Sequence, residues 1–136
     1  MSVIQPSECS LFIQVWVDTD ALVNGQTTGV YIVDNNLNHG SSGEGTVNLS
    51  STVPVGTKIC WSLLNIDPNS NSVLQLQNFG NAGVFGASGT PQMVNQTTWT
   101  GQVQAPGDDH YNINFSATNS GGSGITTSVN PSLNVH

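Results

Sequence analysis

Acidic side chains next to two apolar runs are the first residues in this sequence that could do chemistry. Asp18 and Asp20 stand two residues apart directly after one such run, and Asp34 follows a second. Carboxylate oxygens are the ligands that calcium prefers in proteins. The three aspartates are therefore our candidate metal ligands, with calcium the one cofactor considered. The alternative is that they cap turns and keep a sheet edge soluble.

A second group of polar residues has the chemistry to hold a neutral sugar. An indole ring can bury the apolar face of a sugar while amides and carboxylates bond its hydroxyl groups. Trp99 lies between two threonines, which favours exposure. Trp61 is expected in the core, and Trp16 is expected to be buried there or at a sheet or subunit contact. Turns or core packing are the alternative roles. The candidate ligand-binding residues are Asp34, Asn35, Asn36, Asn38, Trp99, Asp108 and Asp109.

Catalysis would need residues that the sequence does not place together. His39, His110 and His136 are far apart, and no nucleophile elbow of the GxSxG type occurs. A hydrolase would require the fold to gather a histidine, an acid and a serine. We expect no enzymatic activity.

Two cysteines, Cys9 and Cys60, are separated by a long stretch of chain. Sequence alone does not show whether they meet, so a disulfide between strands stays open. No CxxC pair occurs, which argues against a cysteine-rich zinc site. The N-terminus carries no basic region and no long apolar core, so it does not read as a secretory signal. A cytoplasmic protein, in inclusions or released later, with two reduced thiols is the favoured interpretation.

Charge excludes two classes of partner. Only 7% of the 136 residues are charged, compared with roughly 25% in ordinary domains, the net charge is −7, and Lys58 is the one basic residue. Nucleic acid and anionic membranes attract clustered Lys and Arg, so neither is expected. No apolar run is long enough to span a bilayer as a helix. The partners that remain are a neutral glycan, another polar ligand, and further copies of the chain.

The elements that would position these residues are strands. In residues 11–17 (LFIQVWV) large apolar groups alternate, and 43–61 is read as a strand, a Pro-Gly turn and a second strand. Glycine-rich residues 81–92 are expected to form a long functional loop. Eight or nine strands and no amphipathic helix indicate one all-β domain over residues 1–136, an antiparallel sandwich or barrel. The strands are expected at 11–17, 29–33, 46–49, 57–64, 73–79, 97–103, 110–117, 125–129 and 133–135.

Motifs in a fixed order resemble the bacterial AidA/PixA inclusion-body protein family. They are VWVDTD at 15–20, TGV at 28–30, GEGTVNL at 43–49 with VGTKICW at 55–61, and YNINF at 111–115 with VNPSL at 129–133. The resemblance implies an immunoglobulin-like β-sandwich without established catalytic activity. It also implies a link to quorum-regulated traits or to intracellular inclusions. Some inclusion-forming relatives are rich in methionine, whereas this chain has two.

Two functional hypotheses follow. The first is a non-catalytic, lectin-like carbohydrate-binding sandwich that forms homo-oligomers, because its polarity comes from amides and hydroxyls rather than charges. The alternative is a self-assembling structural or storage protein of the inclusion-body kind. Near-absence of lysine leaves sheet edges without their commonest protection against pairing, although a charge of −7 opposes dense packing.

Overall fold

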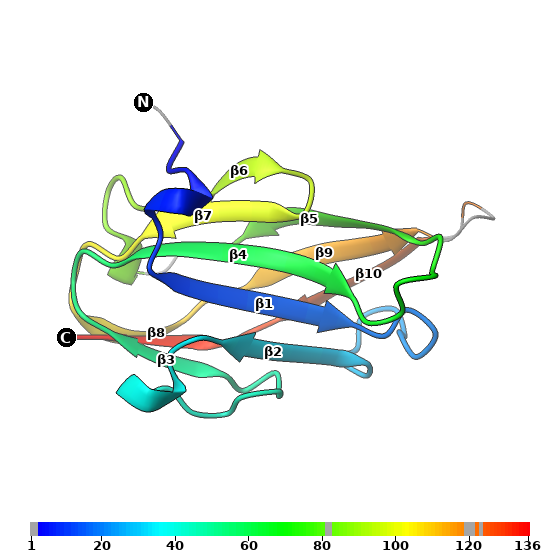
Figure 1. The fold of residues 1–136 in the computed structure, drawn as a ribbon, viewed down its shortest axis with the longest axis horizontal. Coiled ribbons are helices and arrows are strands. Elements are labelled where there is room, and N and C mark those ends of the chain that lie inside the picture. Colours follow the sequence, from blue (N-terminus) through cyan, green and yellow to red (C-terminus); the bar gives the residue numbers. More distant parts are fainter. Residues whose placement is uncertain (1–2, 81–82, 119–121, 123) are drawn as a thin grey trace.

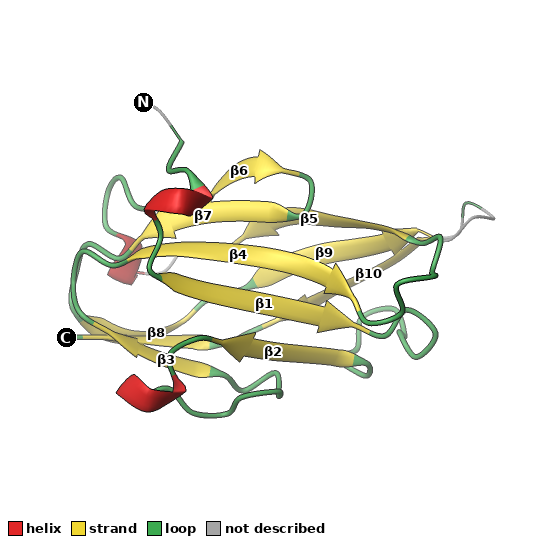
Figure 2. Ribbon diagram, viewed as in Figure 1, coloured by secondary structure: helices red, strands yellow, loops and turns green. Residues whose placement is uncertain are grey.

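The computed structural model describes residues 3–80, 83–118, 122 and 124–136, and within these the chain is built from eleven strands and three short 3-10 helices (Figures 1 and 2). None of the helices is long and apolar enough to cross a membrane, as far as the described residues show. The strands are β1 (Leu11–Val17), β2 (Val30–Asp34), β3 (Ser50–Val53), β4 (Lys58–Asn65), β5 (Val73–Phe79), β6 (Gln92–Asn95), β7 (Thr98–Gln102), β8 (Gly107–His110), β9 (Ile113–Thr118), β10 (Gly124–Val129) and β11 (Ser132–Val135). The helices are η1 (Pro6–Glu8), η2 (Leu37–His39) and η3 (Gly83–Phe85).

Strand β1 follows from its alternating sequence. Its four odd-numbered apolar residues are buried, from Leu11 to Val17, while Phe12, Gln14 and Trp16 point to the other face. Successive side chains of a strand leave opposite faces, so one row enters the core and the other does not. β1 occupies an inner position in a five-stranded sheet with the order β2-β1-β4-β7-β6.

The opposite layer is formed by two three-stranded sheets, β10-β9-β5 and β3-β11-β8. They continue one another along the chain, since β8 leads into β9 through Tyr111 and Asn112, and β10 leads into β11 through Asn130 and Pro131. β9 pairs with β10 and β8 with β11, so the same two chain segments run through both sheets. The two layers enclose one hydrophobic core (Figure 1).

The predicted all-β sandwich is confirmed, but its pairing is mixed rather than purely antiparallel. β1 pairs with β4 in parallel, and β3 pairs with β11 in parallel. The chain leaves the first layer after β2, forms β3 in the second, and returns to the first as β4. A strand that returns by such a crossover can run in the same direction as its neighbour.

Local differences concern the start of β3 and the short strands. The structure begins β3 at Ser50 instead of at residue 46, because Thr46 turns back to the Gly43 carbonyl through its amide and its hydroxyl. Val47 and Leu49 alternate with polar residues, but they follow this turn and do not belong to a strand. β6 and β8 are four-residue strands that were not expected as such: Gln92 was placed in the loop 81–92, residues 107–109 were placed in a turn, and His110 was placed at the start of the strand 110–117.

An aromatic cluster fills the core at the end where β7 and η3 lie. Trp61 is fully buried, lies against Phe79, Phe85 and Tyr111, and donates its indole N–H to the Tyr111 hydroxyl at 3.0 Å. The pair satisfies two polar atoms that would be costly to bury alone. Phe85 belongs to the glycine-rich segment 81–92. The described part of this segment therefore contributes buried side chains to the core.

Candidate functional site

The three aspartates predicted as metal ligands lie at opposite ends of one strand pair. Asp34 is in register with Ile13 near the start of β1, whereas Asp18 and Asp20 follow Val17 at its end. Five residues of extended chain span on the order of 15 Å, too far for one ion to bridge. Among the described residues no group of three or more His, Cys, Asp or Glu side chains could hold a metal. The antiparallel course of β2 thus separates the predicted set.

Asn35 and Asn36 use their amide groups to hold the backbone. Asn35 accepts from the Phe12 N–H at 2.9 Å and donates to the Ser10 carbonyl at 3.2 Å, which extends the β1 pairing beyond β2. Asn36 donates to the Thr52 carbonyl at 2.7 Å and to the Ser41 hydroxyl at 2.9 Å. Both side chains therefore fix the segment after β2, while Asn38 in η2 is exposed.

Asp34 belongs to a polar cluster with Glu44, a residue that sequence reasoning missed. The Asp34 side chain accepts from the Ser51 hydroxyl at 2.6 Å and from the Asn36 N–H at 2.9 Å. Its own N–H donates to Glu44 Oε1 at 2.8 Å, and Gly45 donates to the Ile32 carbonyl at 2.7 Å. Burial, and secondarily the hydrogen bond with Asp34, raises the pKa of Glu44 to about 7. A single acid between two glycines was the only signal in the sequence.

The remaining predicted ligand residues lie elsewhere in the fold. Asp109 in β8 accepts from the Val84 N–H at 3.2 Å and so helps to anchor η3, and Asp108 next to it is exposed. Trp99 is half-buried, with its ring 5.2 Å from that of Phe79. His39 and His110, the histidines considered for a hydrolase, lie in η2 and β8. The predicted residues therefore occupy several places and do not line one pocket.

A polar cleft of about 270 Å³ lies between the N-terminal residues Val3, Ile4 and Glu8 and the strands β6 and β7. Amide side chains of Gln92, Gln102 and Gln104 line it together with Ser88 and Thr90. Gln104 accepts from the Ser88 hydroxyl at 3.0 Å and donates to Gln102 at 3.2 Å, so the amides are already oriented. This arrangement provides neutral donors and acceptors on one concave surface.

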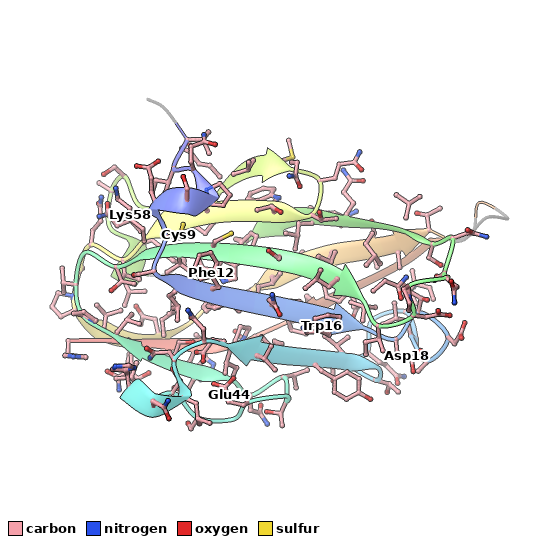
Figure 3. The ribbon with its side chains drawn as sticks, viewed as in Figure 1. Cys9, Phe12, Trp16, Asp18, Glu44 and Lys58 are labelled. Atoms are coloured by element: carbon pink, nitrogen blue, oxygen red, sulfur yellow. The ribbon has the colours of Figure 1, made fainter. Side chains whose placement is uncertain are left out.

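The outer face of the five-stranded sheet carries partly exposed aromatic side chains. Tyr31, Trp16 and Leu64 are in register across β2, β1 and β4 and form one apolar row. Phe12 stands on the same face, 38% exposed, and Tyr31 is 45% exposed. Figure 3 shows Phe12 and Trp16 along β1, with Lys58 beyond the start of this strand and Asp18 at its end. We call these four residues, Phe12, Trp16, Tyr31 and Leu64, the aromatic face.

On the outer face of β2, β1 and β4, no charged side chain lies between Phe12 and the row formed by Tyr31, Trp16 and Leu64. The register places only Gln14, Val33 and Ser62 between Phe12 and the Tyr31–Trp16–Leu64 row. Beside this row, a hollow of about 130 Å³ is lined by Phe12, Gln14, Val33, Asp34 and Asn35. Asp34 is the one acid in the lining of this hollow, and an apolar face with a hollow can receive an apolar side chain of a partner.

Comparison with proteins of known structure shows that this fold occurs in other proteins. The crystal structure of the inclusion body protein PixA from Burkholderia cenocepacia J2315 superposes with a TM-score of 0.71 over 94% of this chain and 96% of that chain, at 17% sequence identity. The resemblance to the AidA/PixA family is thereby confirmed at the level of the fold.

Comparison of the sequence itself gives a family but no annotated relative. No curated protein matches the chain. Residues 9–123 match the family described as "Domain of unknown function (DUF8788)". Because the match extends from just before β1 to the end of β9 and beyond, the chain belongs to this family of domains of unknown function.

Proposed function

We propose that this protein is a non-catalytic, self-associating protein whose copies meet through the aromatic face. The observation that carries the proposal is a partly exposed, uncharged aromatic row on a molecule of net charge −7. Large exposed apolar patches on soluble proteins mark interaction sites. Tyr, Trp and Phe are the residue types enriched where proteins meet.

A second copy is the partner that the charge distribution favours. Two copies that approach through most of their surface bring like charges together, which costs free energy. The rows of the aromatic face carry no charge themselves; the charges around them are Asp34 in the hollow beside Phe12, Asp18 after the end of β1, and the Lys58–Glu8 pair near its start. The name of the PixA relative, an inclusion body protein, supports the same reading of this chain.

Sedimentation velocity over a hundredfold range of concentration tests the proposal. We expect the wild-type protein to shift from monomer to larger species as concentration rises. Tyr31→Lys should hold the protein as a monomer, because an ammonium group would then face its copy across the aromatic row. Acrylamide quenching should decrease on association as Trp16 becomes shielded, because Trp61 is already buried and Trp99 lies on the other face of the sheet.

The matched control is Val73→Lys. Val73 is 57% exposed and lies on β5 in the opposite layer, so the substitution makes the same charge change away from the aromatic face. It should associate almost like the wild type. A wild-type protein that remains a monomer at all concentrations would overturn the proposal, as would equal loss of association in both variants.

The polar cleft favours a second function, the binding of a neutral glycan. The observation that favours it is the hydrogen-bonded series from Ser88 through Gln104 to Gln102. These side chains could bond the hydroxyl groups of one sugar ring. The ligand residues expected from the sequence lie outside this cleft, so the proposal rests on the amides alone.

A glycan-array screen in calcium and again in chelator tests this second function. We expect binding that is unchanged by the chelator and that Gln104→Ala weakens at least about tenfold, the effect of losing a hydrogen bond of about 1.4 kcal/mol. Asn38→Ala is the control, because Asn38 is exposed in η2, far from the residues of the cleft. Absence of binding to every glycan would exclude this function and leave self-association untouched.

A further inference from the structure

Cys9 and Cys60 come together where the N-terminal segment crosses the five-stranded sheet. We use "N-terminal segment" for residues 3–10, which include η1. Ser10 donates its N–H to the Lys58 carbonyl at 3.1 Å, and this places Cys9 beside the first residues of β4. The two thiols are near enough for each to affect the pKa of the other. Both cysteines are free in the structure.

Burial of Cys60 shows that the N-terminal segment covers it. Cys60 alternates with Ile59 and Trp61, so its side chain leaves the outer face of the sheet, on the same side as Phe12. Phe12 is exposed there, yet Cys60 is only 3% exposed. η1 lies against β4 at this point, and Cys9 itself is partly exposed at the border (Figure 3).

The N-terminal segment has few other attachments. The Thr100 hydroxyl donates to the Ile4 carbonyl at 2.6 Å, and Lys58 pairs with Glu8 at 3.4 Å. The ion pair is exposed on both sides, and such pairs contribute little. No residue of η1 is buried. A covalent bond at Cys9 would therefore change how firmly this segment is held far more than any bond now present.

We propose that Cys9 and Cys60 are a redox-active pair that forms a reversible disulfide and thereby fastens the N-terminal segment to β4. A hydroperoxide is the oxidant. Cys9, the accessible thiol, attacks it and becomes a sulfenic acid with release of one water or alcohol molecule. The Cys60 sulfur then attacks the Cys9 sulfur, the S–S bond forms, and the sulfenic oxygen leaves as water. The thiols lose two electrons and the peroxide gains two. A dithiol reductant reverses the change.

The environment of the two thiols makes their oxidation slow at neutral pH. Burial, together with the neighbouring Cys60 and Glu8, raises the pKa of Cys9 to about 11, and burial also raises the pKa of Cys60. Since the thiolate is the reacting form, formation of the disulfide should accelerate as the pH rises from about 7 to 9. The disulfide would also hold one wall of the polar cleft in place, because Val3, Ile4 and Glu8 of the N-terminal segment line that cleft.

The experiment compares the wild-type chain with Cys9→Ser after treatment with hydrogen peroxide at about pH 8.5. Peptide mapping without reduction should find one wild-type product in which the Cys9 and Cys60 peptides are joined within a monomer. The thermal midpoint should rise by on the order of 10 °C, as expected when a disulfide closes a long loop. Amide exchange over residues 3–10 should slow, and dithiothreitol should reverse both effects. Cys9→Ser should show none of these changes.

Three results would overturn the proposal. One is sulfinic or sulfonic acid at Cys9 with Cys60 still a free thiol. Another is cross-linking between chains instead of within one. The third is recovery of both free thiols even at about pH 9. Peptide mapping decides among these on the wild-type protein alone, so the result does not depend on the folding of a variant.

Discussion

The carboxyl group of Glu44 makes the stability of the protein depend on pH. Its pKa in the folded state, about 7, lies above the ordinary value of 4.5 because burial and then Asp34 disfavour its charged form. The folded protein therefore binds this proton more tightly than the unfolded chain does. The resulting stabilisation is complete below about pH 4.5 and is lost as the pH rises through about 7.

Glu44→Gln should remove this dependence, because a glutamine keeps the carbonyl that accepts from Asp34 and has no proton to lose. We expect the variant to have the higher thermal midpoint at about pH 8 and to differ little at about pH 5. Asp20→Asn, an exposed acid with the same charge change, is the control. If both variants shift the midpoint equally at pH 8, net charge rather than Glu44 is the cause.

Single residues were predictable from the sequence where strand alternation decides their environment. Trp61 lies in the core, as its alternation with Ile59 indicated. The roles of Asn35 and Asn36 were not readable, because their partners Ser10, Phe12 and Thr52 belong to other elements. An asparagine that bonds backbone and an asparagine that binds a ligand look alike until the pairing is known.

At the scale of elements, the end of the glycine-rich segment is held against β7 with no space for a side chain. A Cβ atom on Gly89 would lie 1.9 Å from the Gln102 carbonyl oxygen and 2.4 Å from that of Phe85. Gly89→Ala must therefore push apart the contact in which Gln102 donates to the Gly89 carbonyl at 2.9 Å.

We expect Gly89→Ala to lower the free energy of unfolding by about 3 kcal/mol or more, measured as a shift of the urea midpoint. Gly124→Ala on β10 is the matched control, because its added Cβ would meet only Thr118 at an ordinary 3.6 Å. That variant should stay within about 1 kcal/mol of the wild type. Equal stability of the two variants would mean that the segment adjusts freely.

Elements were predictable in proportion to their length and alternation. β1 was placed to the residue, since four buried residues alternate without interruption. β6 and β8 have no such row, because their burial depends on β7 and β11 rather than on their own sequences. Parallel pairing of β1 with β4 left no local signal either, because it is fixed by the path of the chain through the other layer.

For the whole molecule, charge should control self-association through the aromatic face. The sequence has a pI near 4.2, so repulsion between copies falls as the pH is lowered toward that value. Added salt screens the same repulsion. We expect the association constant to rise when the pH is lowered from about 8 to 5 or when salt is added, by light scattering at fixed concentration. Association that weakens under both conditions would indicate ion pairs between copies and would contradict an uncharged interface.

The sandwich as a whole was predictable, and the proposed interaction surface was not. Strand count and turn residues determine the class of fold, whereas the aromatic face exists only because β2 and β4 flank β1 and bring Tyr31 and Leu64 beside Trp16. Sequence reasoning expected Trp16 to be buried, in the core or at a sheet or subunit contact, and the structure shows it half-buried on an outer face.

The position of β11 between β3 and β8 has a consequence for the synthesis of the protein. β3 is made early, yet its partner in the sheet is nearly the final segment of this sequence to be made. β8 also pairs with β11 and cannot form this pairing until β11 has been made. Half of the second layer must therefore stay unpaired while the ribosome translates almost all of the 136 residues. Such long-range pairing makes folding slow and exposes strand edges to neighbouring nascent chains.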